Sequence, residues 1–168
     1  MAAVNNNLGS LLTNSISSYP VFNATGEDIA ESYFKFATCV VPISTTDSAG
    51  STYRMMRVFS SDIPVAIKFS CTALTAGAFD LGLYYSNSTG TGAVVDANRF
   101  AGTVSAASAL VQVDERYTIL DTTTMGQRIW QLIGGLTADP KIYYDLVLTS
   151  TTAATVAGTA SIQYEFTR

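Results

Sequence analysis

The C-terminal part of the chain alternates between apolar and polar residues, and this pattern restricts what it can fold into. Within residues 161–167, the apolar side chains Ile162, Tyr164 and Phe166 alternate with polar ones. A period of two places all of these apolar side chains on one face of a β-strand. The run 142–150 shows a similar alternation, and a short connection of Thr, Ala and Gly separates the two runs. We therefore predict that they form an antiparallel hairpin with one buried face.

An isolated hairpin is at best marginally stable, so the remaining chain must supply strands that cover its apolar face. Further strand-like runs occupy residues 33–41, 53–60, 65–72, 79–85 and 116–120. We predict that Pro42 ends the first of these runs, because proline cannot donate a hydrogen bond to a ladder. The turn around Gly77 predicts that the runs on either side of it form a second hairpin. Apolar residues on both faces of 53–60 indicate an interior strand or one covered by another chain.

The segment 125–133 has its apolar residues at helical spacing, with Trp130 beside them as a core plug. We predict a short helix over this segment, with its N-cap among the threonines 122–124 and its end at Gly134. The stretch 94–110 is rich in alanine and ambiguous, and a single helical turn is predicted within it at residues 96–100.

About seven or eight short strands separated by turn signals favour an all-β fold. We predict an antiparallel two-sheet sandwich, jelly-roll-like, with one short helix near 125–133. Residues 31–168 are expected to form a single β-sandwich domain. Residues 1–30 are polar and contain many turn-forming residues, which predicts an N-terminal arm or extended segment. This segment is either a frayed terminus or an arm that reaches a neighbouring subunit.

The chain contains no histidine, so it lacks the usual general base of Ser-His and Cys-His systems and the commonest ligand of catalytic zinc. Its carboxylates are scattered singly along the sequence. They match neither the paired acids of a glycosidase nor the ligand series of a calcium loop. We therefore predict no catalytic, cofactor-binding or metal-binding residue, and a protein that is not an enzyme.

The charge distribution also restricts the partners. The net charge of -4 and the lack of a Lys/Arg cluster argue against a nucleic-acid partner. No apolar run approaches the roughly 20 residues of a membrane-spanning helix, and we expect neither a membrane partner nor a signal peptide. Cys39 and Cys71 lie inside strand-like runs, where buried free thiols are favoured over a disulfide between neighbouring strands.

Only 13% of the residues are charged, against roughly 25% in an average soluble domain. A surface with so few charges either faces solvent or contacts another protein. Four residues are candidate subunit contacts: Tyr53 and Met55 on the strand with two apolar faces, and Tyr84 and Tyr143 on the outward faces of theirs. Outward tyrosines also stack on sugars, although a second packed layer or a subunit contact is favoured here.

Five segments follow one another in an order that resembles the head decoration, or auxiliary capsid, proteins of tailed bacteriophages. They are CVVPI at 39–43, FDLGLYY at 79–85, GAVVDANRF at 92–100, GQRIWQLIG at 126–134 and DPKIYYDLVL at 139–148. The likeness extends from residue 34 to residue 168, about four-fifths of the chain, and consists of turns, a tryptophan and strand patterns.

This resemblance implies a non-enzymatic jelly-roll protein that binds the outer surface of an assembled phage capsid and stabilises it. The implied partners are the major capsid protein and further copies of the chain, as a trimer. The implied location is the capsid surface of the virion, after synthesis in the host cytoplasm, and the four candidate contact residues become candidates for capsid contacts too. The alternative is a carbohydrate-binding module of a head fibre or tail, with Tyr84 or Tyr143 as a stacking platform.

Overall fold

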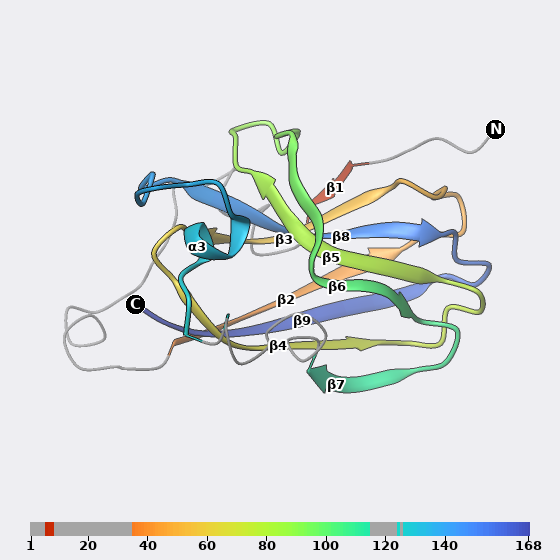
Figure 1. Cartoon of the computed structure of the whole chain (residues 1–168). Helices are drawn as coiled ribbons and strands as arrows, with labels where there is room; N and C mark the ends of the chain where they lie inside the picture. The colour runs from red at the N-terminus through yellow and green to blue at the C-terminus, as the bar shows by residue number, and fades with distance from the viewer. Residues whose placement is uncertain (1–5, 9–34, 115–123, 125) are drawn as a thin grey trace.

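The computed structural model describes residues 6–8, 35–114, 124 and 126–168 of the chain as two β-sheets packed face to face (Figure 1). The strands are β1 (Asn6–Leu8), β2 (Lys35–Ile43), β3 (Thr52–Phe59), β4 (Ile63–Cys71), β5 (Ala78–Tyr85), β6 (Val94–Ser105), β7 (Leu110–Asp114), β8 (Tyr143–Thr152) and β9 (Gly158–Thr167). A short helix, α3 (Ile129–Ile133), lies in the connection that leads to β8.

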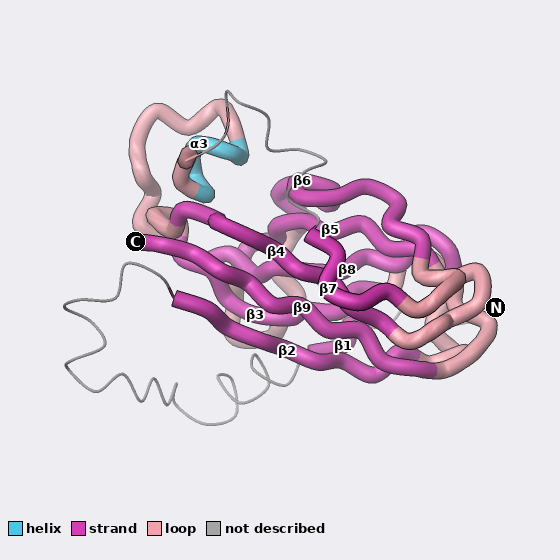
Figure 2. The backbone as a smooth tube through the Cα atoms, turned by 90° about the horizontal axis from the view of Figure 1, so that it is seen from below, coloured by secondary structure: helices cyan, strands magenta, loops and turns pink. Residues whose placement is uncertain are grey.

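One sheet has five strands in the order β1-β3-β8-β5-β6, and the other has four in the order β2-β9-β4-β7. The two layers are visible from below in Figure 2. Every neighbouring pair is antiparallel except β1 and β3, which run parallel. Without β1, two four-stranded sheets joined mostly by connections that cross between them form a jelly roll. The predicted all-β, jelly-roll-like sandwich is confirmed, with one parallel pair added.

Both predicted hairpins are wrong, because the strands assigned to each of them lie in different sheets. β8 belongs to the five-stranded sheet and β9 to the four-stranded sheet, and β5 and β4 are divided in the same way. The connections 153–157 and 72–77 cross the end of the sandwich side by side. The N–H groups of Thr155 and Val156 donate to the carbonyl of the buried Leu74 at 3.2 and 3.3 Å. The alternation showed that each strand has one buried face. It did not show that successive strands belong to different sheets, so that their buried faces meet across the core.

Pro42 does not end its strand. β2 continues to Ile43, and Pro42 lies opposite Thr159 of β9. β2 is the edge strand of its sheet, so one of its sides has no neighbouring strand. On that side, a residue without an N–H group removes no hydrogen bond from the ladder. The proline therefore marks an edge strand here. The stretch 94–110 contains β6 and the start of β7, so the helical turn predicted at 96–100 is wrong. Register shifts along the β5–β6 pair disturb the alternation there.

The core lies between the sheets and is rich in aromatic side chains. The ring of Tyr53 contacts that of Phe79 edge-on, with centroids 6.0 Å apart, and Phe79 lies 6.2 Å from Phe69 of the opposite sheet. Ile162 and Tyr164 are buried, as their alternation predicted. Aromatic side chains bury large areas, so this cluster contributes strongly to the adhesion of the two sheets.

The helix ends at Gly134, as predicted, but it begins at Ile129, later than predicted, with Arg128 as its N-cap. The first N–H groups of the helix donate to the β3–β4 turn. Those of Ile129 and Trp130 bond to the carbonyls of Asp62 and Ser60 at 2.9 and 3.1 Å. These acceptors satisfy donors that have no partner inside a helix, and they position α3 over the end of the sandwich (Figure 1).

Several expectations concern residues outside the described part of the chain. The strand predicted at 116–120 lies there, and so does the predicted arm 1–30 apart from β1. The division into an arm and a single domain stays a prediction. Cys39 and Cys71 are buried and free, as predicted, on strands that β9 separates. No helix among the described residues is long and apolar enough to cross a membrane.

Candidate interaction surfaces

The four predicted contact residues do not form one surface. Tyr53 and Met55 are buried in the core, and Tyr84 is almost completely buried on the outer side of the five-stranded sheet. Tyr143 is 49% exposed. β3 has a register shift between Arg54 and Met56, which explains why alternation along this strand placed apolar residues on both faces. Contact with another chain stays a prediction for all four, and within this chain Tyr143 alone of them is open to a partner.

The outer side of the five-stranded sheet carries a buried pair of opposite charges. Arg54 of β3 and Asp145 of β8 form a salt bridge of 2.8 Å between Nη1 and Oδ2. The second terminal nitrogen of Arg54, Nη2, donates to the carbonyl of Gly92 at 2.6 Å, and its guanidinium lies 5.1 Å from the centroid of the Tyr84 ring. The connection between β5 and β6 therefore covers this part of the sheet. The alternation along the sequence predicted an outward position for Asp145. It did not indicate that the connection between β5 and β6 covers this position.

Arg57 also approaches Asp145, so two guanidinium groups share one carboxylate. Its Nε lies 3.5 Å from Asp145 Oδ1, and its Nη2 donates to the carbonyl of Asn87 at 2.8 Å. Burial raises the pKa of the Asp145 carboxyl, while the Ser86 hydroxyl and the two arginines oppose this shift. The three charged groups carry one excess positive charge, and Arg57 is the more exposed of the two arginines.

Arg57 lines a groove of about 500 Å³ at the end of the five-stranded sheet. The lining residues come from the ends of β3, β5 and β8 and from the connections beside them: Arg57, Tyr85, Ser86, Asn87, Ser88, Lys141, Ile142 and Tyr143. Tyr85 and Tyr143 are 48% and 49% exposed. Their inner faces are held in place, since Tyr85 lies 5.8 Å from the Tyr144 ring and Tyr143 lies 4.9 Å from the Phe59 ring.

Sequence reasoning missed Arg57, Lys141 and Tyr85 as residues of this groove. Alternation placed Tyr85 with the inward residues, but it is the last residue of β5, where the facing strand no longer covers it. Its position directly before a loop of Ser, Asn, Thr and Gly was the available signal.

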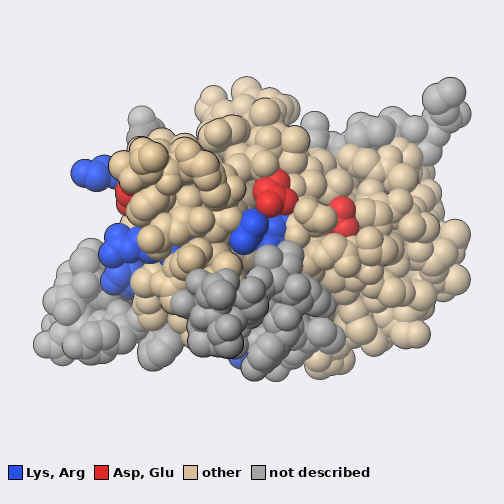
Figure 3. Space-filling view, in the orientation of Figure 1, with Lys and Arg blue, Asp and Glu red and all other residues tan. Residues whose placement is uncertain are grey.

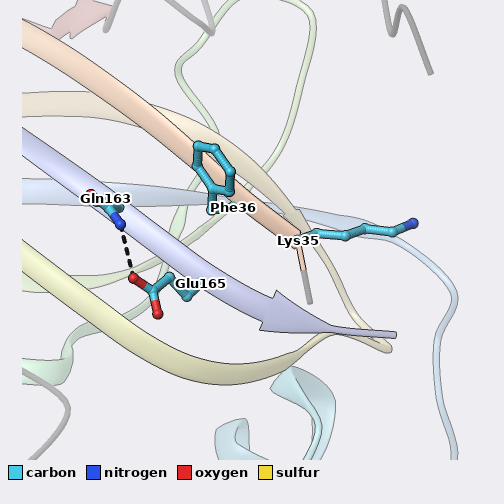
Figure 4. A pocket seen from close by; sticks show the side chains of 4 residues that line it. All are labelled: Lys35, Phe36, Gln163 and Glu165. Atoms are coloured by element: carbon cyan, nitrogen blue, oxygen red, sulfur yellow. Dashed lines mark hydrogen bonds between the residues drawn. The ribbon is translucent and has the colours of Figure 1, made fainter. Parts of the chain in front are cut away.

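A second, smaller hollow of about 260 Å³ lies on the outer face of the four-stranded sheet (Figure 4). Lys35 and Phe36 of β2 and Gln163 and Glu165 of β9 line it. The Gln163 amide donates to Glu165 Oε1 at 2.8 Å, and Lys68 of β4 forms a salt bridge with the same carboxylate. Phe36 is 74% exposed, and Lys35 extends away from the other three side chains in Figure 4.

Among the described residues, no three His, Cys, Asp or Glu side chains gather as they would around a metal ion. On the face shown in Figure 3, the charged groups form small clusters separated by wide uncharged areas. This arrangement is suited to contacts with another molecule through neutral and aromatic groups.

No family model matches the sequence, and the curated proteins contain no match. Among solved structures, the chain is similar to a chain of the "Cyanophage Pam1 capsid asymmetric unit", with a TM-score of 0.51. The similarity covers 86% of this chain and 98% of that chain, at 11% sequence identity. At this identity the comparison concerns the fold alone: the two chains share a common architecture over almost the whole of the capsid chain.

Proposed function

We propose that this protein is a non-enzymatic structural protein of a bacteriophage virion that binds the outer surface of the capsid and stabilises it. The observation that carries the proposal is the shared fold with a chain of a phage capsid asymmetric unit, which extends over 98% of that chain. The five segments that resemble decoration proteins support the same assignment. The proposed partners are the major capsid protein and two further copies of this chain.

The described surface fits repeated contacts with other subunits. Phe36 and Val40 are exposed on the edge strand β2, on a face where Lys68 and Glu165 neutralise each other in a salt bridge. Apolar side chains on an edge strand are protected when another subunit covers them. Attachment over many copies on a capsid does not require a strong single contact, because many weak interfaces act together.

Quantitative mass spectrometry of purified virions tests this proposal directly. The amount of the protein is scaled to the major capsid protein, with a tail protein as a low-copy reference. We expect a copy number of the same order as that of the capsid subunits. A handful of copies, or none, would contradict attachment to the head shell.

A second candidate function is a carbohydrate-binding module of a head fibre or tail. The half-exposed ring of Tyr143 in the groove favours it, because exposed aromatic rings stack on sugars. This function predicts a low copy number together with measurable binding to a glycan. The two candidates are therefore separated by the same count of copies per virion.

A further inference from the structure

We propose that the groove lined by Arg57, Lys141 and Tyr143 binds an acidic saccharide, with its carboxylate held by the two cations and its ring packed on Tyr143. This inference does not depend on attachment to a capsid. It names the ligand class of a site on the chain itself.

The charge of the groove favours an anion. Its lining includes the cations Arg57 and Lys141 but no carboxylate. Among the described residues, the acid in contact with Arg57 is Asp145, whose side chain is fully buried and whose Oδ2 already accepts from Arg54. Asp139 is close to Lys141, and hydrogen bonds from the Ser60 hydroxyl and the Lys141 backbone N–H lower the pKa of its carboxyl, so it stays ionised and offsets part of the charge of Lys141, but it does not line the groove. A positive groove on a chain with a net charge of -4 is a local feature and does not follow from the overall composition.

The geometry of Arg57 suits a carboxylate. Its Nη2 donates to the Asn87 carbonyl, and its Nε lies near Asp145. These two contacts hold the guanidinium at the groove and do not use all of its N–H groups. A guanidinium presents its N–H groups as a planar fork that matches the two oxygens of a carboxylate. Lys141, on the connection that leads into β8, adds a second positive charge to the lining.

The aromatic and polar groups favour a sugar ring over a simple anion. Tyr143 exposes about half of its surface, and its other face rests on the Phe59 ring. The apolar C–H face of a pyranose packs on such rings, whereas inorganic phosphate has no apolar face to offer. Ser88 supplies a hydroxyl to the same lining, a group that sugar hydroxyls pair with, while the Ser86 hydroxyl already bonds to Asp145 and the Asn87 amide oxygen accepts from the Thr91 N–H.

The walls of the groove are held by the backbone of the fold. Tyr143 lies opposite Phe59 in the β3–β8 ladder, and Tyr85 lies opposite Tyr144 in the β5–β8 ladder. The Ser86 N–H donates to the Tyr143 carbonyl at 3.4 Å, which joins the start of the loop to β8. The two tyrosines lie on neighbouring strands of one sheet, but their rings lie on opposite faces of it, Tyr143 beside Phe59 on the outer face and Tyr85 beside the core residue Tyr144. Tyr143 is therefore the ring that the groove offers to a saccharide, and the ladder holds it in place.

The test is isothermal titration calorimetry of the full chain with two matched pairs of probes. Oligogalacturonate is compared with the same oligomer after carboxyl reduction, and 3′-sialyllactose is compared with lactose. We expect binding of at least one acidic probe and about tenfold weaker binding of its neutral counterpart, because only the acidic form pairs with the cations. Addition of salt should reduce this difference.

Variants locate the binding in the groove. Tyr143→Ala should weaken it about threefold to tenfold through loss of the stacking ring, while Tyr143→Phe should retain most of it. Lys141→Ala should weaken binding of the acidic probe about threefold and leave the neutral probe unchanged. Phe36→Ala, at an exposed ring on the other sheet, is the matched control and should bind as the wild type does.

Three outcomes would overturn the proposal. They are no binding of either acidic probe up to about 10 mM, equal binding of acidic and neutral probes, and binding that Tyr143→Ala leaves unchanged. Loss of capsid attachment in Lys141→Ala without any saccharide binding would reassign the groove to contact with a protein. None of these results changes the copy number of the protein in virions, so the proposed function is tested separately.

Discussion

Arg54 and Asp145 form a salt bridge of 2.8 Å on the outer side of the five-stranded sheet, and their side chains are only 2% and 0% exposed. A position that faces outward along a strand is therefore not a surface position here. The β5–β6 connection covers it, and the Gly92 carbonyl in this connection accepts a hydrogen bond from Arg54. Two charges that lie 91 residues apart in the sequence become one buried unit.

Asp145→Ala should destabilise the protein by about 3–5 kcal/mol, because it leaves the buried guanidinium of Arg54 without its partner. Urea unfolding monitored by circular dichroism measures the free energy of unfolding. The control is Lys68→Ala, which removes a partly exposed salt bridge with Glu165 and should cost no more than about 1 kcal/mol. Equal losses in the two variants would show that burial of the Arg54–Asp145 pair has no special effect.

Gly82→Ala should destabilise the protein by about 1–3 kcal/mol or more, because its new methyl group meets backbone atoms. A Cβ at this position would lie 2.1 Å from the Asp96 carbonyl oxygen and 2.3 Å from the backbone of Ala97. Gly102→Ala is the matched control in the neighbouring strand, since its nearest contact is the Asn98 amide at 3.7 Å. Thermal unfolding of both variants checks the prediction. A Gly82 variant as stable as the Gly102 variant would contradict the close approach of β6.

Tyr164→Phe should reduce the loss of stability at alkaline pH. Burial holds the pKa of the Tyr164 phenol well above its ordinary value, and its hydroxyl has no hydrogen-bond partner among the described residues. In the unfolded chain the phenol ionises at about pH 10, while the folded chain keeps it protonated. The contribution of the Tyr164 phenol to stability is therefore fully present below about pH 10. It is lost as the pH rises towards the pKa of the phenol in the folded chain.

The measurement is the free energy of unfolding of wild type and variant between about pH 8 and pH 11. The two proteins should be similar at neutral pH and diverge above about pH 10, by up to roughly 1.4 kcal/mol per pH unit. The control is Tyr143→Phe, which removes the hydroxyl of a half-exposed ring. Parallel curves for wild type and Tyr164→Phe across the whole range would refute the expectation.

We expect the exposed side chains Phe36 and Val40 of β2 to contact the capsid, so Phe36→Asp should weaken attachment to capsid particles by about tenfold or more. The free energy of unfolding should change by no more than about 0.5 kcal/mol, because the ring is 74% exposed. Thr38→Asp places the same charge on the same exposed face of β2 without removal of a ring. Co-sedimentation with particles that lack the protein measures the effect. Wild-type binding of Phe36→Asp would remove this face from the interface.

Part of the fold was predictable because it depends on single strands. The alternation at 161–167 correctly indicated that Ile162 and Tyr164 face the core, and the glycine after residue 133 correctly indicated the end of the helix. The pairing of the strands was not predictable in the same way. Alternation describes which side of a strand is apolar, and it is the same whether the next strand lies beside it or across the core.

The candidate groove was predictable only in part. The outward position of Tyr143 followed from its strand, but Arg57 and Tyr85 join it through a sheet order that local sequence does not encode. Tyr84 has the same outward pattern as Tyr143 and yet is buried, since the guanidinium of Arg54 lies over its ring. Whether an outward side chain is exposed depends on whether a connection between two strands crosses the outer face of the sheet above it.

The sequence by itself determined that the chain forms β-strands with one apolar face each, that its charges are few, and that histidine chemistry is absent. These properties follow from side-chain chemistry and from the period of two in a strand. The tertiary structure alone decided that successive strands divide between two sheets, that Arg54 and Asp145 are buried together, and that Tyr85 and Tyr143 line one groove with Arg57. The physical reason is that these contacts join residues far apart in the chain, and they exist only when burial of both sheet faces has selected one strand order.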